Sequence, residues 1–234
     1  MPNAIITGAT QGIGKAITEK LLANGFSVAI CARTEKDLVD LSSAWTQQYP
    51  AATILALQAD LGEKQQVFNF AGKVLDTFSE IDILVNNAGL FFPGRLADEP
   101  EGHLEKLMEV NMYSAYYLTR AIVPAIKRDG SGHIFNNCSV ASLKAYPNGG
   151  AYSISKYALL GFSENLRHEL VNENIRVTAI CAGATWTRSW ESAGIDRSRM
   201  MEAEDVAEMV WATYNLSSKA DVETIIMRPT TGDL

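Results

Sequence analysis

The chain has 234 residues, of which 47% are hydrophobic and 20% charged, and its formal net charge is −7. This length and balance suit one large α/β domain with a sizeable core. The negative charge argues against nucleic acid or an anionic membrane as the main partner, and no apolar run approaches the ~20 residues of a membrane span.

Cysteine and histidine usage narrows the chemistry further. The three cysteines are widely spaced, and their odd number argues against a disulfide framework and for a reducing compartment. The histidines lack metal-ligand spacing, so no metal site is expected. No basic segment followed by a longer apolar core opens the chain. We therefore expect no secretory signal and a cytoplasmic location.

Short β-branched runs alternate with longer helical patterns, which is typical of a parallel sheet with crossover helices. Strands are expected at residues 4–7, 27–32, 53–59, 81–86, 132–137, 175–181 and 222–227. Helices are expected at residues 13–24, 35–49, 64–78, 100–127, 152–172 and 204–216. These elements predict a single α/β domain over residues 1–234. We expect a doubly wound Rossmann fold with a seven-stranded parallel sheet, helices on both faces, and ligands beyond the carboxyl ends of the strands.

The first expected strand runs into a glycine-rich turn and then a helix. Glycines let the backbone turn tightly and approach a pyrophosphate at a helix N-terminus. Many loops use glycine for positive φ, so the motif alone is weak. Its place at the first strand-to-helix junction favours dinucleotide binding. The expected cofactor contacts here are Gly8, Thr10, Gln11, Gly12, Ile13 and Gly14.

The second expected strand ends at Ala32, followed by Arg33 and Thr34. A site for NAD(H) usually has an Asp or Glu about 20 residues after the glycine-rich turn, where it accepts from the ribose 2′-hydroxyl. No carboxylate occurs here before Glu35. Arg33 could instead bind a 2′-phosphate, although an exposed Arg at a strand end is common. The missing acid and the present base favour NADP(H) over NAD(H).

Polar residues follow the third and fourth expected strands. Asp60, before Leu61, could accept from an adenine amino group or cap the helix that starts near Glu63. The fourth strand ends in Asn86-Asn87-Ala88-Gly89, which suits a hydrogen-bonded floor beneath a ligand or an ordinary Asn-rich turn. Expected cofactor contacts in these two segments are Asp60, Leu61, Asn87, Ala88 and Gly89.

Tyr152 and Lys156 lie four residues apart on an expected helix and therefore project from one face. A nearby cation favours the phenolate, lowers the pKa of the phenol and makes it a proton donor near neutral pH. An amphipathic helix with an exposed Lys and a half-buried Tyr would give the same pattern. This pair alone therefore does not distinguish a catalytic proton donor from an ordinary surface helix.

Together these motifs resemble the short-chain dehydrogenase/reductase family, in its short single-domain branch. Four motifs match in order: Thr7-Gly-x3-Gly-x-Gly, Asn86-Asn-Ala-Gly, Ser139 thirteen residues before Tyr152, and Tyr152-x3-Lys156. Asn111 falls where the family keeps a catalytic Asn. The resemblance covers nearly the whole chain, from Ile5 to about Met227.

The resemblance implies hydride transfer between the nicotinamide C4 and a carbonyl or alcohol carbon. Tyr152 would act as general acid in reduction and as base in oxidation. Lys156 would lower its pKa and hold the nicotinamide ribose hydroxyls. Ser139 would polarise the substrate oxygen, or merely turn the chain. Asn111 would hold, through its main chain, a water that links Lys156 to solvent, or merely bend its helix.

The chain departs from the family pattern after the sixth strand, where Ala182-Gly183 replaces Pro-Gly. Gly183 is still expected to contact the cofactor. Thr187 keeps the place of the Thr that contacts the nicotinamide amide and diphosphate, with Thr185 as a competitor. Residues 186–200 lie where the family has a substrate-covering lid, and Trp186 and Trp190 are either lid aromatics or packed loop residues.

The sequence predicts an NADP(H)-dependent oxidoreductase that interconverts a ketone or aldehyde with an alcohol. A 3-oxoacyl-thioester reductase is an alternative, disfavoured because Gly150 stands where a Gln would precede Tyr152. A non-catalytic NADP(H)-sensing protein is another, although such members usually lose the Tyr or Lys. The partners expected are a small carbonyl or alcohol substrate and, by family resemblance, a homodimer or homotetramer.

Overall fold

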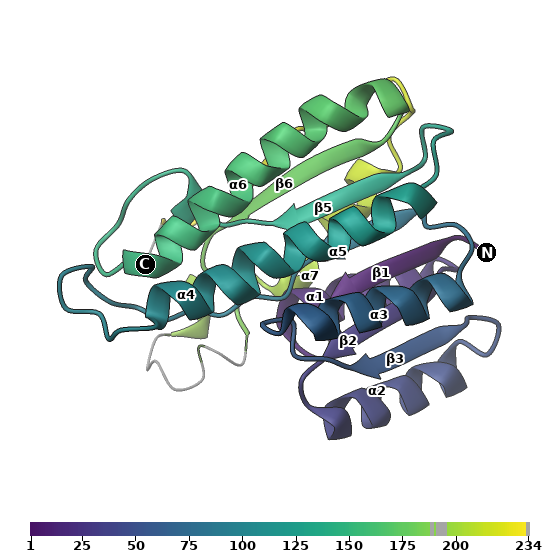
Figure 1. The fold of residues 1–234 in the computed structure, drawn as a ribbon, viewed down its shortest axis with the longest axis horizontal. Helices are drawn as coiled ribbons and strands as arrows, with labels where there is room; N and C mark the ends of the chain where they lie inside the picture. Colours follow the sequence, from purple (N-terminus) through teal and green to yellow (C-terminus); the bar gives the residue numbers. More distant parts are fainter. Residues whose placement is uncertain (188–189, 191–195, 233–234) are drawn as a thin grey trace.

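A seven-stranded parallel sheet forms the centre of the molecule, with strand order β3-β2-β1-β4-β5-β6-β7 (Figure 1). The computed structural model describes residues 1–187, 190 and 196–232. The strands are β1 (Asn3–Thr7), β2 (Ser27–Ala32), β3 (Ile54–Gln58), β4 (Ile83–Asn86), β5 (His133–Asn137), β6 (Arg176–Ala182) and β7 (Thr224–Met227). The predicted Rossmann architecture is confirmed, and every expected strand is present with its ends within two residues.

Alternating residues of the central strands feed two hydrophobic cores on opposite faces of the sheet. On one face Ile6 of β1 packs with Ile30 of β2 and Val85 of β4. On the other face the neighbouring Ile5 and Leu84 pack with Ile134 of β5. Successive side chains of a strand point to opposite faces, so a strand covered on both sides is apolar throughout.

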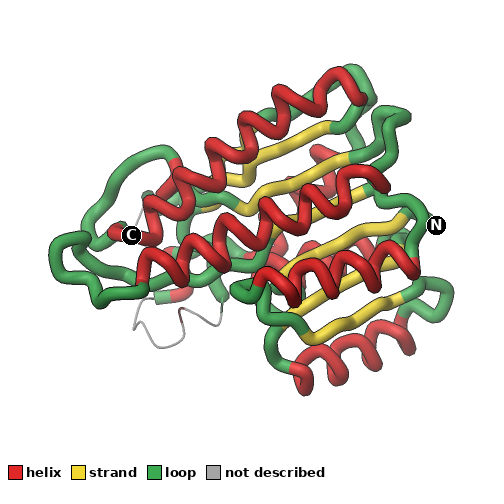
Figure 2. Tube along the Cα trace, viewed as in Figure 1, coloured by secondary structure: helices red, strands yellow, loops and turns green. Residues whose placement is uncertain are grey.

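Helices cover both faces, as expected. The first core is covered by α1 (Gly12–Ala23), α2 (Glu35–Gln48) and α7 (Ala203–Tyr214). The second core is covered by α3 (Lys64–Thr77), α5 (Ser114–Ile122) and α6 (Gly150–Leu170). Figure 2 shows the long helical segments that lead through α5 and α6 running side by side across the near face.

The fourth expected helix differs from its prediction. It spans His103–Ile122 rather than residues 100–127, because Gly102 precedes it at φ +84° and Pro124, which lacks an N–H, stands in a short 3₁₀ turn that follows. The helix is interrupted between α4 (His103–Met108) and α5 by a π-helical turn, Glu109–Tyr113. Asn111 lies in that turn.

The carboxyl ends of the strands lie at one edge of the sheet, on the left in Figure 1. From β1 the chain adds β2 and β3 on one side of that strand, and then β4 to β7 on its other side. The direction in which strands are added therefore reverses between β1 and β4. Crevices at such reversals bind ligands in open α/β sheets. None of the helices in the described parts of the chain is long and apolar enough to cross a membrane.

Candidate active site

A cavity of about 830 Å³ opens at this edge, a size within the usual range for small-molecule sites. Residues from both sides of the strand reversal line it. All the residues expected to contact a cofactor line it except Gly14: Gly8, Thr10, Gln11, Gly12, Ile13, Arg33, Thr34, Asp60, Leu61, Asn87, Ala88, Gly89, Tyr152, Lys156, Gly183, Thr185 and Thr187. Sequence positions up to 179 residues apart thus meet in one space.

The glycine-rich turn needs its glycines for two separate reasons. Gly8 and Gly12 have φ values of +64° and +52°, in the left-handed region that side chains disfavour. At Gly12 an added Cβ would also lie 2.6 Å from Cγ2 of Thr187. Gly14 is buried beneath the cavity, and a Cβ there would collide with the carbonyl oxygen of Gly8 and the side-chain amide of Asn87. Gly14 therefore lets α1 pack closely against the end of β1.

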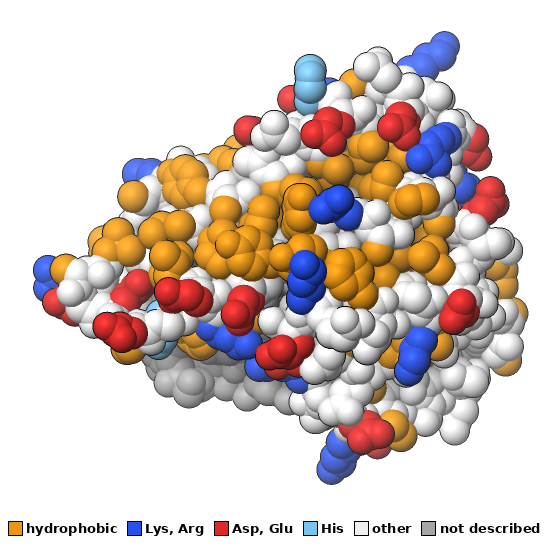
Figure 3. Space-filling view, viewed as in Figure 1, with side chains coloured by type: hydrophobic (Ala, Val, Ile, Leu, Met, Phe, Trp, Pro, Cys, Tyr) orange, Lys and Arg blue, Asp and Glu red, His pale blue; other side chains and the backbone are white. Residues whose placement is uncertain are grey.

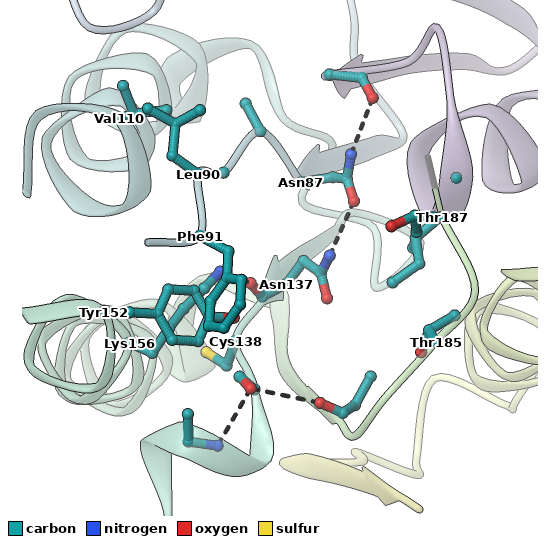
Figure 4. A pocket seen from close by; sticks show the side chains of 18 of the residues that line it. Asn87, Leu90, Phe91, Val110, Asn137, Cys138, Tyr152, Lys156, Thr185 and Thr187 are labelled. Atoms are coloured by element: carbon teal, nitrogen blue, oxygen red, sulfur yellow. Dashed lines mark hydrogen bonds between the residues drawn. The ribbon is translucent and has the colours of Figure 1, made fainter. Parts of the chain in front are cut away.

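Asn87 joins the ends of three strands (Figure 4). Its Nδ2 donates to the carbonyl oxygens of Thr7 and Gly8 at 2.8 and 3.1 Å, and its Oδ1 accepts from Nδ2 of Asn137 at 2.8 Å. The Thr7 hydroxyl oxygen accepts from the N–H groups of Asn87 and Ala88, both at 2.9 Å. The Asn-Asn-Ala-Gly segment is therefore a hydrogen-bonded floor. Asn137 was not anticipated, although its place at a strand's carboxyl end was an available signal.

At the far end of the cavity Arg33 and Thr34 are exposed and follow β2. Asp60 lies next to them on β3's carboxyl side. Its carboxylate accepts from the N–H of Gly62 at 2.9 Å and closes a local turn. The alternative that Asp60 caps the next helix is wrong, because the N-cap residue of α3 (Lys64–Thr77) is Glu63, no side chain bonds that end, and the Asp60 carboxylate bonds the N–H of Gly62.

Ser139, Tyr152 and Lys156 meet at the other end. The buried Lys156 donates from Nζ to the carbonyl oxygen of Asn137 at 2.7 Å, and Nζ lies 5.9 Å from the Tyr152 ring centroid. The Ser139 oxygen accepts from the N–H of Ala141 at 3.1 Å. Ser142, the neighbouring serine, does not line the cavity, so only Ser139 can reach a ligand there.

The environment of Tyr152 favours its neutral form. Burial raises the pKa of the phenol to about 12, while a hydrogen bond with Ser139 acts in the opposite direction. Burial also lowers the pKa of Lys156. The Lys156 ammonium, which donates to the Asn137 carbonyl, does not offset the effect of burial. The expected net lowering of the pKa of Tyr152 is therefore wrong for this structure, and burial keeps the phenol protonated at neutral pH.

Asn111 is buried and acts on the surroundings of the cavity without lining it. Its Oδ1 accepts from the N–H of Leu90 at 2.7 Å, and its Nδ2 donates to the Leu90 carbonyl at 3.0 Å and to Ser155 Oγ at 2.9 Å. Gly89 lies close to both groups, since a Cβ added to it would lie 3.3 Å from Asn111 Oδ1 and 3.6 Å from Lys156 Nζ. Asn111 therefore ties the loop after β4 to the helix that carries Tyr152.

The two candidate threonines in the segment after β6 make different contacts. The buried Thr185 donates its hydroxyl to the carbonyl of Gly183 at 3.0 Å, whereas Thr187 lies against Gly12. Much of the expected lid, residues 188–189 and 191–195, lies outside the described residues. Trp190 lines the cavity with its ring 6.0 Å from Phe91, whereas Trp186 packs with Arg197, 5.4 Å away, and does not line it.

Within the described residues, no group of three or more His, Cys, Asp or Glu side chains is arranged to hold a metal ion. Hydroxyl, amide and ammonium groups and the glycine-rich turn line the cavity. This combination on a doubly wound sheet is typical of a dinucleotide-binding fold.

The comparisons with known proteins agree. Residues 2–198 match the model of the short chain dehydrogenase family, and the chain belongs to that family of oxidoreductases. A sepiapterin reductase from Chlorobaculum tepidum is 32% identical, with 98% of this chain and 97% of that protein covered.

Two solved structures share the fold over almost the whole chain. An alcohol dehydrogenase from Thermococcus sibiricus complexed with 5-hydroxy-NADP has a TM-score of 0.91 at 26% identity, covering 100% of this chain and 99% of that one. A short chain dehydrogenase from Burkholderia cenocepacia in complex with NADP has a TM-score of 0.88 at 27% identity, covering 99% and 97%.

The packing of Gly14 yields a stability prediction. Gly14→Ala should lower the free energy of unfolding by about 1–3 kcal/mol, because the added methyl group overlaps Gly8 and Asn87. Gly72→Ala is the matched control, since Gly72 lies in α3 with nothing within 4 Å of an added Cβ. It should stabilise the protein by up to about 1 kcal/mol. Urea unfolding of both variants measures the difference, and equal effects would contradict the packing role.

Proposed function

We propose that this chain is an NADP(H)-dependent oxidoreductase that interconverts a ketone or aldehyde with an alcohol. The observation that carries the proposal is one cavity with a glycine-rich turn and Arg33 at one end and Ser139, Tyr152 and Lys156 at the other. The similarity to a sepiapterin reductase and to dehydrogenases solved with NADP supports the same activity class.

The residues present fit a phosphorylated dinucleotide. Gly8 and Gly12 keep the backbone open at the N-terminus of α1, where N–H groups and the helix dipole favour a pyrophosphate. Arg33, rather than a carboxylate, directly follows β2 and lines the cavity, and it would bind a 2′-phosphate. Thr187 would contact the nicotinamide amide and diphosphate. When bound, the nicotinamide supplies or accepts the hydride.

The protein's own part in the reaction is to manage the charge on the substrate oxygen. In reduction, Tyr152 would donate its phenol proton to that oxygen, and the Ser139 hydroxyl would hydrogen-bond to it as negative charge develops. Lys156 would hold the nicotinamide ribose hydroxyls, and its positive charge favours the phenolate left behind. Asn111 would hold, through its main chain, the water that links Lys156 to solvent.

A second copy of this chain is the proposed partner. Apolar side chains gather on the face formed by α4, α5 and α6 (Figure 3). Leu104, Tyr113, Ile154 and Tyr157 are exposed there. A self-complementary contact across a two-fold axis would remove them from water and give a homodimer or, with a second such contact, a homotetramer.

Tyr152→Phe tests the catalytic assignment. The variant should lose about 10²- to 10⁴-fold in kcat/KM for carbonyl reduction, because the ring remains but the proton donor is gone. NADPH affinity, measured by fluorescence titration, should change little. Tyr157→Phe, on the exposed side of the same helix, is the control and should keep full activity.

The substrate panel for this test spans keto acids, diketones, pteridines and acetoacetyl thioesters. Turnover confined to thioesters would favour the acyl-thioester alternative. A wild-type protein that binds NADPH and turns over no member of the panel would overturn the proposal and favour a sensing role.

Arg33→Ala tests the cofactor assignment. The KM for NADPH should rise by roughly 10- to 100-fold, because charge-assisted hydrogen bonds to the 2′-phosphate are lost, while the kinetics with NADH should stay unchanged. Arg128→Ala, which removes an exposed ion pair with Glu173 (3.0 Å), is the control. Equal kcat/KM values for NADH and NADPH in the wild type, unaffected by Arg33→Ala, would remove Arg33 from this role.

Tyr157→Glu tests the second-copy partner. A charge placed in the buried contact should dissociate the oligomer, so light scattering should report a lower mass, approaching that of one 25.5 kDa chain. Val39→Glu, exposed on α2 on the opposite side of the sheet, should leave the mass unchanged. A wild-type protein that is already monomeric at micromolar concentration contradicts the assignment.

A further inference from the structure

The end of the cavity next to Tyr152 is walled by three aromatic side chains from separate segments. Phe91 comes from the loop after β4, Tyr146 from the loop before α6, and Trp190 from the segment after β6. Phe91 lies next to the Tyr152 ring (Figure 4). None of the three belongs to the motifs that define the hydride-transfer site, so their role must be sought in what else the cavity holds.

The geometry leaves aromatic surface free for a ligand. The Phe91 and Tyr152 rings meet edge to face, with centroids 4.8 Å apart and planes at 86°. Phe91 and Trp190 are inclined by 31° with centroids 6.0 Å apart, too close for a ring between them. Phe91 and Tyr146 are 39% and 38% exposed and line the cavity. A flat ring would therefore lie against the open side of this wall, where aromatic pairing adds to the burial of apolar surface.

The wall is held in place by hydrogen bonds. Glu99, from the same loop as Phe91, accepts from the N–H of Ala151 with both carboxylate oxygens, at 2.9 and 3.2 Å. The N–H of Gly94 donates to the carbonyl of Asn148 at 3.0 Å. These bonds connect the Phe91 loop to the Tyr146 loop and to the first turn of α6 at Ala151, the residue before Tyr152. A surface fixed before binding loses less entropy when a ligand arrives.

The charges around this end exclude one class of ligand. The lining carboxylates of the described cavity, Asp37 and Asp60, follow β2 and β3 at the opposite end of the sheet order. The charged residues that line the cavity near the aromatic wall are Lys144 and Lys156, whereas the Glu99 carboxylate is bonded to the Ala151 N–H and does not line the cavity. A cationic substrate would therefore find no counter-charge among the lining residues here, whereas an uncharged or anionic one meets no repulsion from them.

We propose that the substrate of this site is a planar aromatic carbonyl compound, uncharged or anionic, whose ring stacks on Phe91 beside Tyr146 and Trp190 while its carbonyl reaches Tyr152 and Ser139. This rests on the proposed function and specifies its substrate class. In the step, the carbonyl carbon takes a hydride from NADPH, which is oxidised to NADP⁺. The carbonyl oxygen takes the Tyr152 proton, and the product is an alcohol, which is secondary where the substrate is a ketone.

Two diketones of matched length test the proposal: 1-phenylpropane-1,2-dione, whose ring is flat, and 1-cyclohexylpropane-1,2-dione, whose ring is puckered. NADPH oxidation gives kcat/KM for each with the wild type, Phe91→Leu and Phe92→Leu. Phe92 is the matched control, because its ring packs 4.9 Å from His103 and does not line the cavity.

The wild type should prefer the phenyl compound by about 3- to 10-fold, the range that aromatic pairing supplies. Phe91→Leu should reduce that preference to near unity, and Phe92→Leu should retain it. Tyr146→Leu, on an exposed loop, is a second variant in case Phe91→Leu folds poorly, and it should reduce the preference in part.

Equal kcat/KM for the two diketones in the wild type, or a preference that survives both cavity variants, overturns the aromatic substrate class while leaving carbonyl reduction intact. A wild type that turns over neither diketone nor any aryl ketone, yet reduces aliphatic keto acids, overturns it as well. The proposed function itself fails only if no carbonyl compound of any class is reduced.

Discussion

The hydrogen bonds of Asn87 are the constraint on which the site depends. One amide group fixes the ends of β1, β4 and β5 relative to one another, at the point where the strand order reverses. The series continues, because the carbonyl of Asn137 accepts from the buried Lys156. A continuous set of bonds therefore runs from the glycine-rich turn to the ammonium group. Since an unpaired buried amide or ammonium is costly, each member holds the next in position.

Asn111 supplies a second constraint, through a separate set of hydrogen bonds. The π-helical turn brings its side chain out of the helical repeat, so that it can bond both backbone groups of Leu90 and the hydroxyl of Ser155. Such turns in helices occur frequently at functional sites. The loop that begins at Leu90 then carries Phe91 and Glu99. The same residue that the family pattern marks for proton relay therefore also anchors the wall proposed to select the substrate.

The sequence predicted what local patterns determine. Apolar runs located every strand, the four-residue spacing placed Tyr152 and Lys156 on one helix face, and the glycine-rich turn marked the crevice. Other features were predicted wrongly or missed. The expected helix over residues 100–127 ran past Gly102 and Pro124, which are local signals for the ends of the observed helix. The cap considered for Asp60 does not form, because its carboxylate bonds the N–H of Gly62 instead. Asn137 and Phe91 are recognisable as site residues only in the fold, where distant segments meet.

The pKa of Tyr152 shows why a motif does not fix a residue's properties. Two effects oppose each other at this phenol: removal from water disfavours the phenolate, and a nearby ammonium favours it. Here burial prevails and raises the pKa of the phenol to about 12, while the Lys156 ammonium donates to the Asn137 carbonyl and lies 5.9 Å from the phenol ring centroid. A phenol that keeps its proton is the form that reduction requires, since the acid must still hold the proton when the carbonyl arrives. Alcohol oxidation requires the phenolate, so in that direction the positive charge of Lys156, which favours the phenolate, opposes the effect of burial.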